Sequence, residues 1–148
     1  MSSSRIGTIN HLGLSVTEKA RSFKFYHFLL VDLLGFKQGQ DTPYFTAFLH
    51  PTGGAEIIIS PARSNVEHDR YNPGYHHLAL NVDSPEQVDQ IHAKLVQFYA
   101  ENQSELGAKA KILDQPALYP QYTDGYYAVF FADPDGMKLE IVYMPGGH

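Results

Sequence analysis

Two histidines and two glutamates recur at matching places in the two halves of this 148-residue chain. His11 lies in the segment INHLGLSV at residues 9–16, and His77 lies in YHHLALNV at residues 75–82. Glu56 and Glu140 each follow a glycine-containing turn and directly precede an isoleucine. Imidazole nitrogens and carboxylate oxygens are suitable donors for Zn, Ni, Co, Mn or Fe(II), and two carboxylates balance a divalent charge. The repeat therefore predicts one divalent-metal site held by His11, Glu56, His77 and Glu140.

Each of these residues also has a simpler interpretation. A histidine on a strand can be a hydrogen-bonded core residue, and Glu56 can be a solvated residue at the start of a strand. A glutamate that alternates into a buried face, as Glu140 does, is costly unless it is paired or bound to a metal. The duplication favours metal binding for the two histidines and Glu140 and, less strongly, for Glu56.

The composition limits the partners of such a site. Lys and Arg number 11 and Asp and Glu 16, and the net charge of −5 disfavours a protein that follows nucleic-acid phosphates. Cysteine is absent, which excludes thiolate ligands and disulfides. The first five residues lack a signal-peptide core, and no apolar run approaches the roughly 18 residues that span a bilayer. We expect a cytoplasmic protein with a small-molecule substrate, and neither nucleic acid nor membrane as a partner.

The local patterns indicate the elements that carry these residues. Alternation in each histidine segment puts the histidine on one face of a strand and the leucines on the other. A helix signal follows each strand: Thr17 is the expected cap of a first helix ending near Gly35, and Ser84-Pro85-Glu86-Gln87 begins a second. β-type runs follow at residues 44–50 and 56–60, and again at 126–132 and 138–143. Each half thus shows a strand, a helix and at least two further strands, and we interpret each half as one βαβββ unit.

The two units are interpreted as modules of one domain that spans residues 1–148. Module 1 covers about residues 6–64, a linker covers about 65–74, and module 2 covers about 75–144. The second module has 18 more positions between its histidine and its glutamate than the first. We place this extra length in a loop at residues 101–123.

The motifs around these residues resemble the vicinal oxygen chelate superfamily, which includes glyoxalase I, extradiol dioxygenases, fosfomycin-resistance transferases and bleomycin-resistance proteins. The resemblance extends over about residues 9–143. It rests on the two histidine strands, on Phe25-Tyr26 and Leu34-Gly35-Phe36, and on DPDGMKLE at residues 133–140. It implies an α+β fold in which two tandem βαβββ modules form an open, half-barrel-like mixed sheet around a metal cleft, often completed in a homodimer.

The resemblance also implies roles for the four residues. His11, Glu56, His77 and Glu140 match the metal ligands of glyoxalase I, whereas dioxygenases and fosfomycin-type enzymes typically use the positions of both histidines and Glu140 alone. A lyase or isomerase of glyoxalase type is implied, in which the metal acts as a Lewis acid on a substrate with vicinal oxygens and an enediolate-like intermediate forms. Glu140, and secondarily Glu56, would be the catalytic carboxylates that carry a proton between adjacent carbons.

Other positions bear on the substrate. Ser15 and Ser60 stand where glutathione-using members tend to carry Arg and Asn, so glutathione is a doubtful cosubstrate here. Aromatic side chains are expected to wall the cleft and limit water, although a core position is almost equally compatible with their pattern. They are Tyr119, Tyr122, Tyr126 and Phe130.

Two alternatives stay open at this point. One is a non-catalytic, bleomycin-resistance-type protein that sequesters a planar ligand in the aromatic cleft. The other is an Fe(II) extradiol-type dioxygenase, which requires open coordination positions.

Overall fold

The computed structural model describes residues 4–146, so residues 1–3 and 147–148 of the expected domain, with the start of the N-terminal segment, lie outside the described part. Contacts divide the chain into two compact units, residues 1–65 and 66–148. Across residues 4–146, no helix combines the length and the apolar character that crossing a membrane requires.

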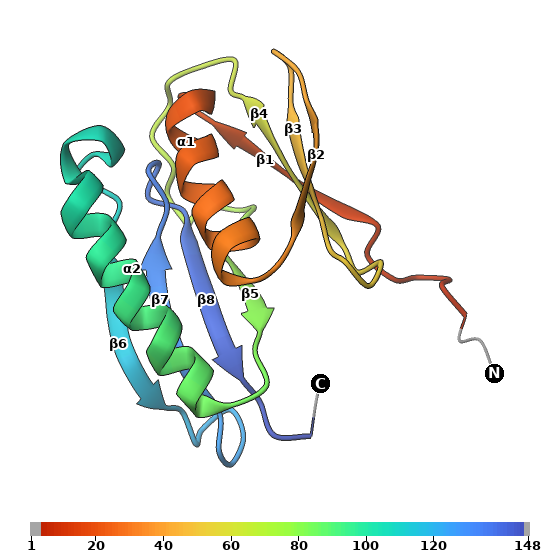
Figure 1. The fold of residues 1–148 in the computed structure, drawn as a ribbon, viewed down its shortest axis with the longest axis vertical. Helices are drawn as coiled ribbons and strands as arrows, with labels where there is room; N and C mark the ends of the chain where they lie inside the picture. Colours follow the sequence, from red (N-terminus) through yellow and green to blue (C-terminus); the bar gives the residue numbers. More distant parts are fainter. Residues whose placement is uncertain (1–3, 147–148) are drawn as a thin grey trace. The chain divides into compact units, whose positions relative to one another are not determined.

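The first unit contains strand β1 (His11–Val16), helix α1 (Lys19–Tyr26), the π-helical segment η1 (His27–Leu33), and strands β2 (Lys37–Asp41), β3 (Thr46–Leu49) and β4 (Glu56–Pro61). Its strands form one sheet in the order β1-β4-β3-β2, with β1 parallel to β4 and the other pairs antiparallel. Helix α1 lies against β4 (Figure 1).

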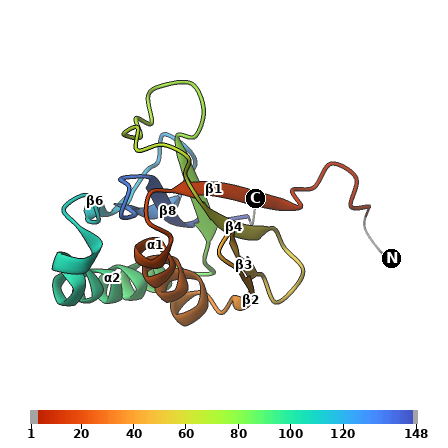
Figure 2. The same ribbon diagram turned by 90° about the horizontal axis from the view of Figure 1, so that it is seen from above.

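The second unit repeats this arrangement. It contains β5 (His77–Asn81), α2 (Pro85–Leu106), β6 (Ile112–Leu118), β7 (Tyr127–Ala132) and β8 (Lys138–Tyr143). The sheet order is β5-β8-β7-β6, again with one parallel pair, β5 and β8. Helix α2 contacts β6, β7 and β8, and Figure 2 shows it on one side of β6 and β8. The predicted α+β class with two βαβββ modules is confirmed.

The sequence patterns did not locate β2 and β6. Both strands lie at the end of their sheet, where one side has no strand partner. Strand β2 has the polar sequence KQGQD, and β6 contains Pro116. Edge strands tolerate polar residues and proline because half of their backbone groups face away from the sheet. The alternation that identifies a half-buried strand is therefore missing from them.

Of the two predicted helix N-caps, one is confirmed and the other is wrong. Ser84 is the N-cap of α2, and its side chain accepts a hydrogen bond from the Gln87 backbone N–H at 3.2 Å, as predicted. The Gln87 side chain accepts from the backbone N–H of Asp83, one residue before the cap. Thr17 is not the cap of α1: the N-cap is Glu18, whose side chain makes no capping bond. The first helix continues through η1, and Gly35 follows it with φ of +78°.

The extra length of the second half is not one loop, and that expectation is wrong. Helix α2 alone has 22 residues and continues to Leu106. Strand β6 then occupies residues 112–118, inside the stretch expected to be irregular, and pairs with β7. Residues 119–126 form the connection between these two strands, and this connection carries Tyr119 and Tyr122.

Alternation decides which side chains enter the core of the first unit. Leu14 and Val16 of β1 and Ile57 and Ile59 of β4 are buried, together with Phe25, Tyr26, Leu29 and Leu30 of the first helix. Burying an aliphatic or aromatic side chain of this size contributes roughly 1.5–3 kcal/mol. The residues between the buried ones on β1 and β4 fall on the opposite face. His11 and Glu56 are therefore displayed on the face that does not carry the core.

Candidate metal centre

The second unit brings His77 and Glu140 into contact. They lie on the neighbouring parallel strands β5 and β8, and the Nε2 atom of His77 is 3.3 Å from Oε1 of Glu140. Only 1% of Glu140 is exposed, whereas His77 is exposed to solvent. Histidine and carboxylate ligands lie about 2.0–2.2 Å from a zinc ion, so two ligands of one ion are separated by about 3 Å. The pair fits two adjacent ligands of a divalent ion.

Tyr126 engages the other oxygen of this carboxylate. The Tyr126 hydroxyl donates a hydrogen bond to Oε2 of Glu140, and both side chains are buried. Burial and the hydrogen bond to Glu140 raise the pKa of Tyr126, so the phenol keeps its proton at neutral pH. With Oε2 engaged by Tyr126, Oε1 is the carboxylate oxygen directed at His77.

Both candidate histidines contact the preceding residue through Nδ1. His11 Nδ1 is 2.7 Å from Oδ1 of Asn10, and His77 Nδ1 is 2.7 Å from Nδ1 of His76. A carboxamide oxygen can only accept, so His11 donates from Nδ1 and keeps the lone pair on Nε2. Metal-binding histidines commonly use their second nitrogen for such a bond, which sets the tautomer and the ring orientation. In both units Nε2 is the nitrogen left for a ligand role.

The strand register shows that the two glutamates do not occupy equivalent positions in the two units. In the first unit Glu56 is the register partner of His11, whereas in the second unit the partner of His77 is Lys138. Glu140 is instead the partner of Ala79, and the corresponding position of the first unit holds Ile58. Two strand residues span about 6.6 Å. The expectation that Glu56 and Glu140 occupy equivalent places is wrong by two residues.

Each unit contains one pair of the four predicted ligands. His11 and Glu56 stand side by side on β1 and β4 of the first unit, with Glu56 half-buried. His77 and Glu140 make the pair of the second unit. Throughout residues 4–146, the structure contains no cluster of three or more His, Cys, Asp or Glu side chains placed to hold a metal.

The four aromatic residues named from the sequence do come together. Tyr119 stacks on Tyr122 with ring centroids 5.7 Å apart, and it meets Tyr126 and Phe130 edge-on at 6.2 and 5.5 Å. Phe130 is the register partner of Glu140, and its ring lies 6.3 Å from that of His77. Tyr126 and Phe130 are buried, whereas 64% of Tyr122 is exposed. The cluster therefore extends from the buried carboxylate toward solvent.

Sequence reasoning missed two polar neighbours of these residues. The Nζ atom of Lys138 lies 4.5 Å from the centre of the Phe130 ring, which places a positive charge beside the aromatic cluster. Alternation along β8 was the available signal, because it puts Lys138 on the same face as Glu140. The second neighbour is His76, which contacts the His77 ring.

Comparison with known proteins agrees with this architecture. Residues 8–141 match the family described as Glyoxalase/Bleomycin resistance protein/Dioxygenase superfamily. The chain is 27% identical over 139 residues to the metallothiol transferase FosB of Staphylococcus epidermidis, covering 92% of this chain and 81% of that protein. It is 28% identical over 137 residues to the uncharacterized protein YqjT of Bacillus subtilis, covering 90% and 97%.

A solved structure supports the same fold. The glyoxalase/bleomycin resistance protein from Albidiferax ferrireducens superposes with a TM-score of 0.68 at 21% identity, covering 92% of this chain and 98% of that one. The repeated βαβββ units, the histidine on the first strand of each and the match over residues 8–141 lead to one assignment. The chain belongs to the glyoxalase/bleomycin resistance protein/dioxygenase superfamily.

Proposed function

We propose that this protein is a divalent-metal-dependent enzyme that binds a small substrate through two adjacent oxygens. The observation that carries the proposal is the buried Glu140 carboxylate, with one oxygen bound by Tyr126 and the other directed at His77 Nε2. A buried carboxylate without a cation is costly, and a divalent ion would offset that cost. When bound, the ion supplies Lewis acidity at the substrate oxygens.

The proposed ligands are His11, His77 and Glu140, one histidine from each unit and the carboxylate of the second. The register supports this set because Glu56 is displaced by two residues from the position equivalent to Glu140. Two histidines and one carboxylate leave coordination positions open for a substrate with vicinal oxygens. Zn, Ni, Co, Mn and Fe(II) all accept these donors.

The neighbouring side chains would orient the proposed metal ligands and line the substrate site. Tyr126 holds the Glu140 carboxylate, and Asn10 and His76 orient the two imidazoles. Tyr119, Tyr122 and Phe130 form an aromatic wall that excludes water on one side of the carboxylate. The ammonium group of Lys138 adds positive charge beside this wall, which favours a substrate with an anionic oxygen.

Thiol transfer is the reaction type favoured by the register and by the relatives. The three-ligand set is the one implied for transferases and dioxygenases of this superfamily, and two relatives at 27% and 24% identity are metallothiol transferases. Proton transfer of the glyoxalase type is the second candidate. It is favoured by Glu56, which lies on β4 as the register partner of His11 on β1. Glu56 would offer a second carboxylate.

Metal titration of two matched variants tests the ligand set. Glu140→Gln and Glu56→Gln each exchange one carboxylate for an amide of the same shape. After removal of all metal with a chelator, we expect Glu140→Gln to bind Zn, Mn or Ni at least 100-fold more weakly than wild type by calorimetry. Glu56→Gln should stay within about threefold.

The other outcomes are equally informative. An equal loss in Glu56→Gln would overturn the three-ligand set in favour of the four-ligand glyoxalase form. A wild-type protein that binds no divalent ion would overturn metal dependence altogether. Ligand binding that is unchanged by EDTA would then favour a sequestering protein.

Activity assays separate the two reactions. Thiol consumption with fosfomycin as acceptor reports transfer, and turnover of a thiol with methylglyoxal reports the glyoxalase reaction. Each assay should compare glutathione with a smaller thiol, because Ser15 and Ser60 make glutathione a doubtful cosubstrate. Loss of turnover in Glu140→Gln but not in Glu56→Gln is expected for transfer.

The family resemblance also leads us to propose a cytoplasmic homodimer with one domain per chain. Sedimentation at several protein concentrations measures the oligomeric state. Mixing His11→Ala and His77→Ala chains then tests whether ligands of one site come from two chains. Recovery of metal binding in the mixture is expected for a shared site, and no recovery for a site within one chain.

A further inference from the structure

Strand β5, which carries His77, is packed less firmly than its counterpart β1. It lies at the end of its sheet, and within residues 4–146 it pairs only with β8. Its side chains Leu78 and Leu80 are half-buried, whereas Leu14, the counterpart of Leu80 on β1, is buried. The register of a strand is fixed by the burial of its apolar face, so a strand with a half-buried face depends on further contacts for its register.

Tyr75 makes such a contact directly before β5. Its hydroxyl donates a hydrogen bond to the backbone carbonyl of Lys138 at 2.6 Å, and the His68 ring meets the Tyr75 ring edge-on at 5.7 Å. Lys138 is the register partner of His77, so this bond joins the two strands at the first pair of their ladder. A slip of β5 by two residues, which alternation permits, would move the hydroxyl about 6.6 Å from the carbonyl and break the bond.

The first unit carries a different residue at this place. Ile9 is the counterpart of Tyr75 in the repeated segment; it has no hydroxyl, and its side chain is exposed. In that unit the register partner of His11 is Glu56 itself. Tyr75 therefore belongs to the unit in which the carboxylate lies two residues beyond the partner of the histidine.

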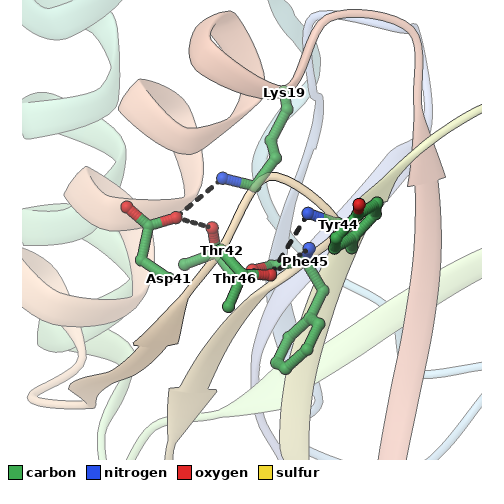
Figure 3. Close-up of polar contacts among 6 residues, drawn as sticks. All are labelled: Lys19, Asp41, Thr42, Tyr44, Phe45 and Thr46. Carbon is green, nitrogen blue, oxygen red and sulfur yellow. Dashed lines mark hydrogen bonds and ion pairs between the residues drawn. The ribbon is translucent and has the colours of Figure 1, made fainter.

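Ion pairs in both units join side chains to each other and leave the strand register open. In the first unit Asp41 accepts from Lys19 and Thr46, both at 2.7 Å, and these bonds hold the pKa of Asp41 below its usual value (Figure 3). In the second unit Lys109 lies 3.0 Å from Glu67, which ties the segment before β5 to the connection between α2 and β6. The Tyr75 bond differs from these contacts because it ends on the backbone of a strand.

The register of β5 bears directly on the proposed metal ligands. In the observed register, Nε2 of His77 is 3.3 Å from Oε1 of Glu140. Two ligands of one zinc ion lie about 3 Å apart, so a slip of about 6.6 Å would separate them. Functional groups of a site must be held within about 0.5 Å of their working geometry. A contact that prevents small displacements of β5 therefore also maintains the ligand geometry.

We propose that Tyr75 is a positioning residue that fixes His77 beside Glu140 through its hydrogen bond to the Lys138 carbonyl. It acts through the backbone of β8 and is not itself a metal ligand. Its effect on metal binding rests on the proposed function, whereas its effect on the placement of β5 does not. The two effects are therefore measured separately.

Tyr75→Phe and Tyr99→Phe form a matched pair of variants. The Tyr99 hydroxyl donates to the carbonyl of Ala132 at 2.7 Å, and Ala132 is the register partner of Lys138 on β7. Each substitution thus removes one hydroxyl-to-carbonyl bond at the same end of the β7–β8 pair. Tyr99 lies on α2, whereas the chain at Tyr75 continues directly into β5. We expect similar decreases in the urea midpoint of the two variants.

Amide exchange of the full-length protein in EDTA tests the positioning role without any metal. NMR follows the backbone amides of residues 77–81. We expect them to exchange about tenfold faster in Tyr75→Phe than in Tyr99→Phe, because only the first substitution frees β5. Equal exchange in the two variants would overturn the proposal, since the hydroxyl would then stabilise the unit without fixing the strand.

Titration with Zn or Mn tests the consequence for the ligand pair. Tyr75→Phe should bind the ion about tenfold more weakly than wild type by calorimetry, and the absorption spectrum of its Co(II) form should change. Tyr99→Phe should keep the wild-type affinity and spectrum. Unchanged binding by Tyr75→Phe, or an equal loss in both variants, would overturn the positioning role. Wild-type protein that binds no divalent ion would overturn the proposed function, and amide exchange would then decide the role of Tyr75.

Discussion

Replacing Tyr126 with phenylalanine removes the hydroxyl that donates to the buried Glu140 carboxylate within the described residues 4–146. Tyr126 is 8% exposed and Glu140 1%, so water has little access to replace the lost donor. Hydrogen bonds to charged groups contribute about 1.5–3 kcal/mol, and an unsatisfied buried charge costs at least as much. We expect Tyr126→Phe to lower the free energy of unfolding by about 2 kcal/mol in the metal-free protein, measured by urea denaturation near pH 7.

The adjacent tyrosine provides a matched control. The Tyr127 hydroxyl also donates to a carboxylate, Asp89 Oδ1 at 2.7 Å, but this hydrogen bond is exposed to solvent. Tyr127→Phe should therefore cost about 0.5 kcal/mol or less. A double-mutant cycle with Glu140→Gln isolates the buried interaction, because the hydroxyl then has no charged acceptor. A coupling energy near zero, or equal losses in the two tyrosine variants, would refute this reasoning.

The same substitution tests the role of Tyr126 in metal binding. Residues that orient a metal ligand typically contribute 10- to 100-fold in affinity. We expect Tyr126→Phe to weaken divalent-ion binding by about tenfold in calorimetric titrations. The absorption spectrum of the Co(II)-loaded variant should also change, because Oε2 of Glu140 is released from its hydrogen bond. An unchanged affinity and spectrum would make Tyr126 a purely structural residue.

Three further perturbations test the units separately. Asn10→Ala should weaken metal binding by about tenfold without a loss of stability, since it removes the group that orients His11; calorimetry and thermal unfolding measure the two effects. Asp41→Asn should lower stability at neutral pH. Because the folded pKa of Asp41 is depressed, its contribution is present above the usual pKa of 3.8 and disappears as the pH falls through the folded value, so wild type and variant should converge in acid denaturation series. Ser84→Ala should cost about 1 kcal/mol in urea unfolding through loss of the α2 cap, and Ser84→Asp should retain most of the stability.

The local patterns of the chain were sufficient for much of the fold. Alternation located β5 and β8 closely, since predicted residues 138–143 match β8 and residues 75–82 enclose β5. Ser84 and Pro85 marked the start of α2 because a side-chain cap and a proline act within one turn of the helix. The polar edge strand β2 was not visible in this way, because no apolar face distinguishes it from a loop.

The candidate site was predicted in part. The sequence singled out His77, Glu140 and four aromatic residues, and the structure shows that His77 contacts Glu140 and that the four rings form one cluster. The hydrogen bond from Tyr126 to Glu140 could not be anticipated, because it depends on how the segment before β7 approaches β8.

The sequence by itself determined that each half runs from a histidine strand through a helix to further strands, and it determined the face of each strand on which the histidines and glutamates lie. Only the tertiary structure decided the register, and with it the different positions of Glu56 and Glu140. Side chains alternate with a period of two, so a shift of two residues leaves every residue on the same face and is invisible to alternation. The register of two parallel strands depends on how the helix and strands between them pack. The position of the carboxylate relative to the histidine is therefore fixed only when the unit folds.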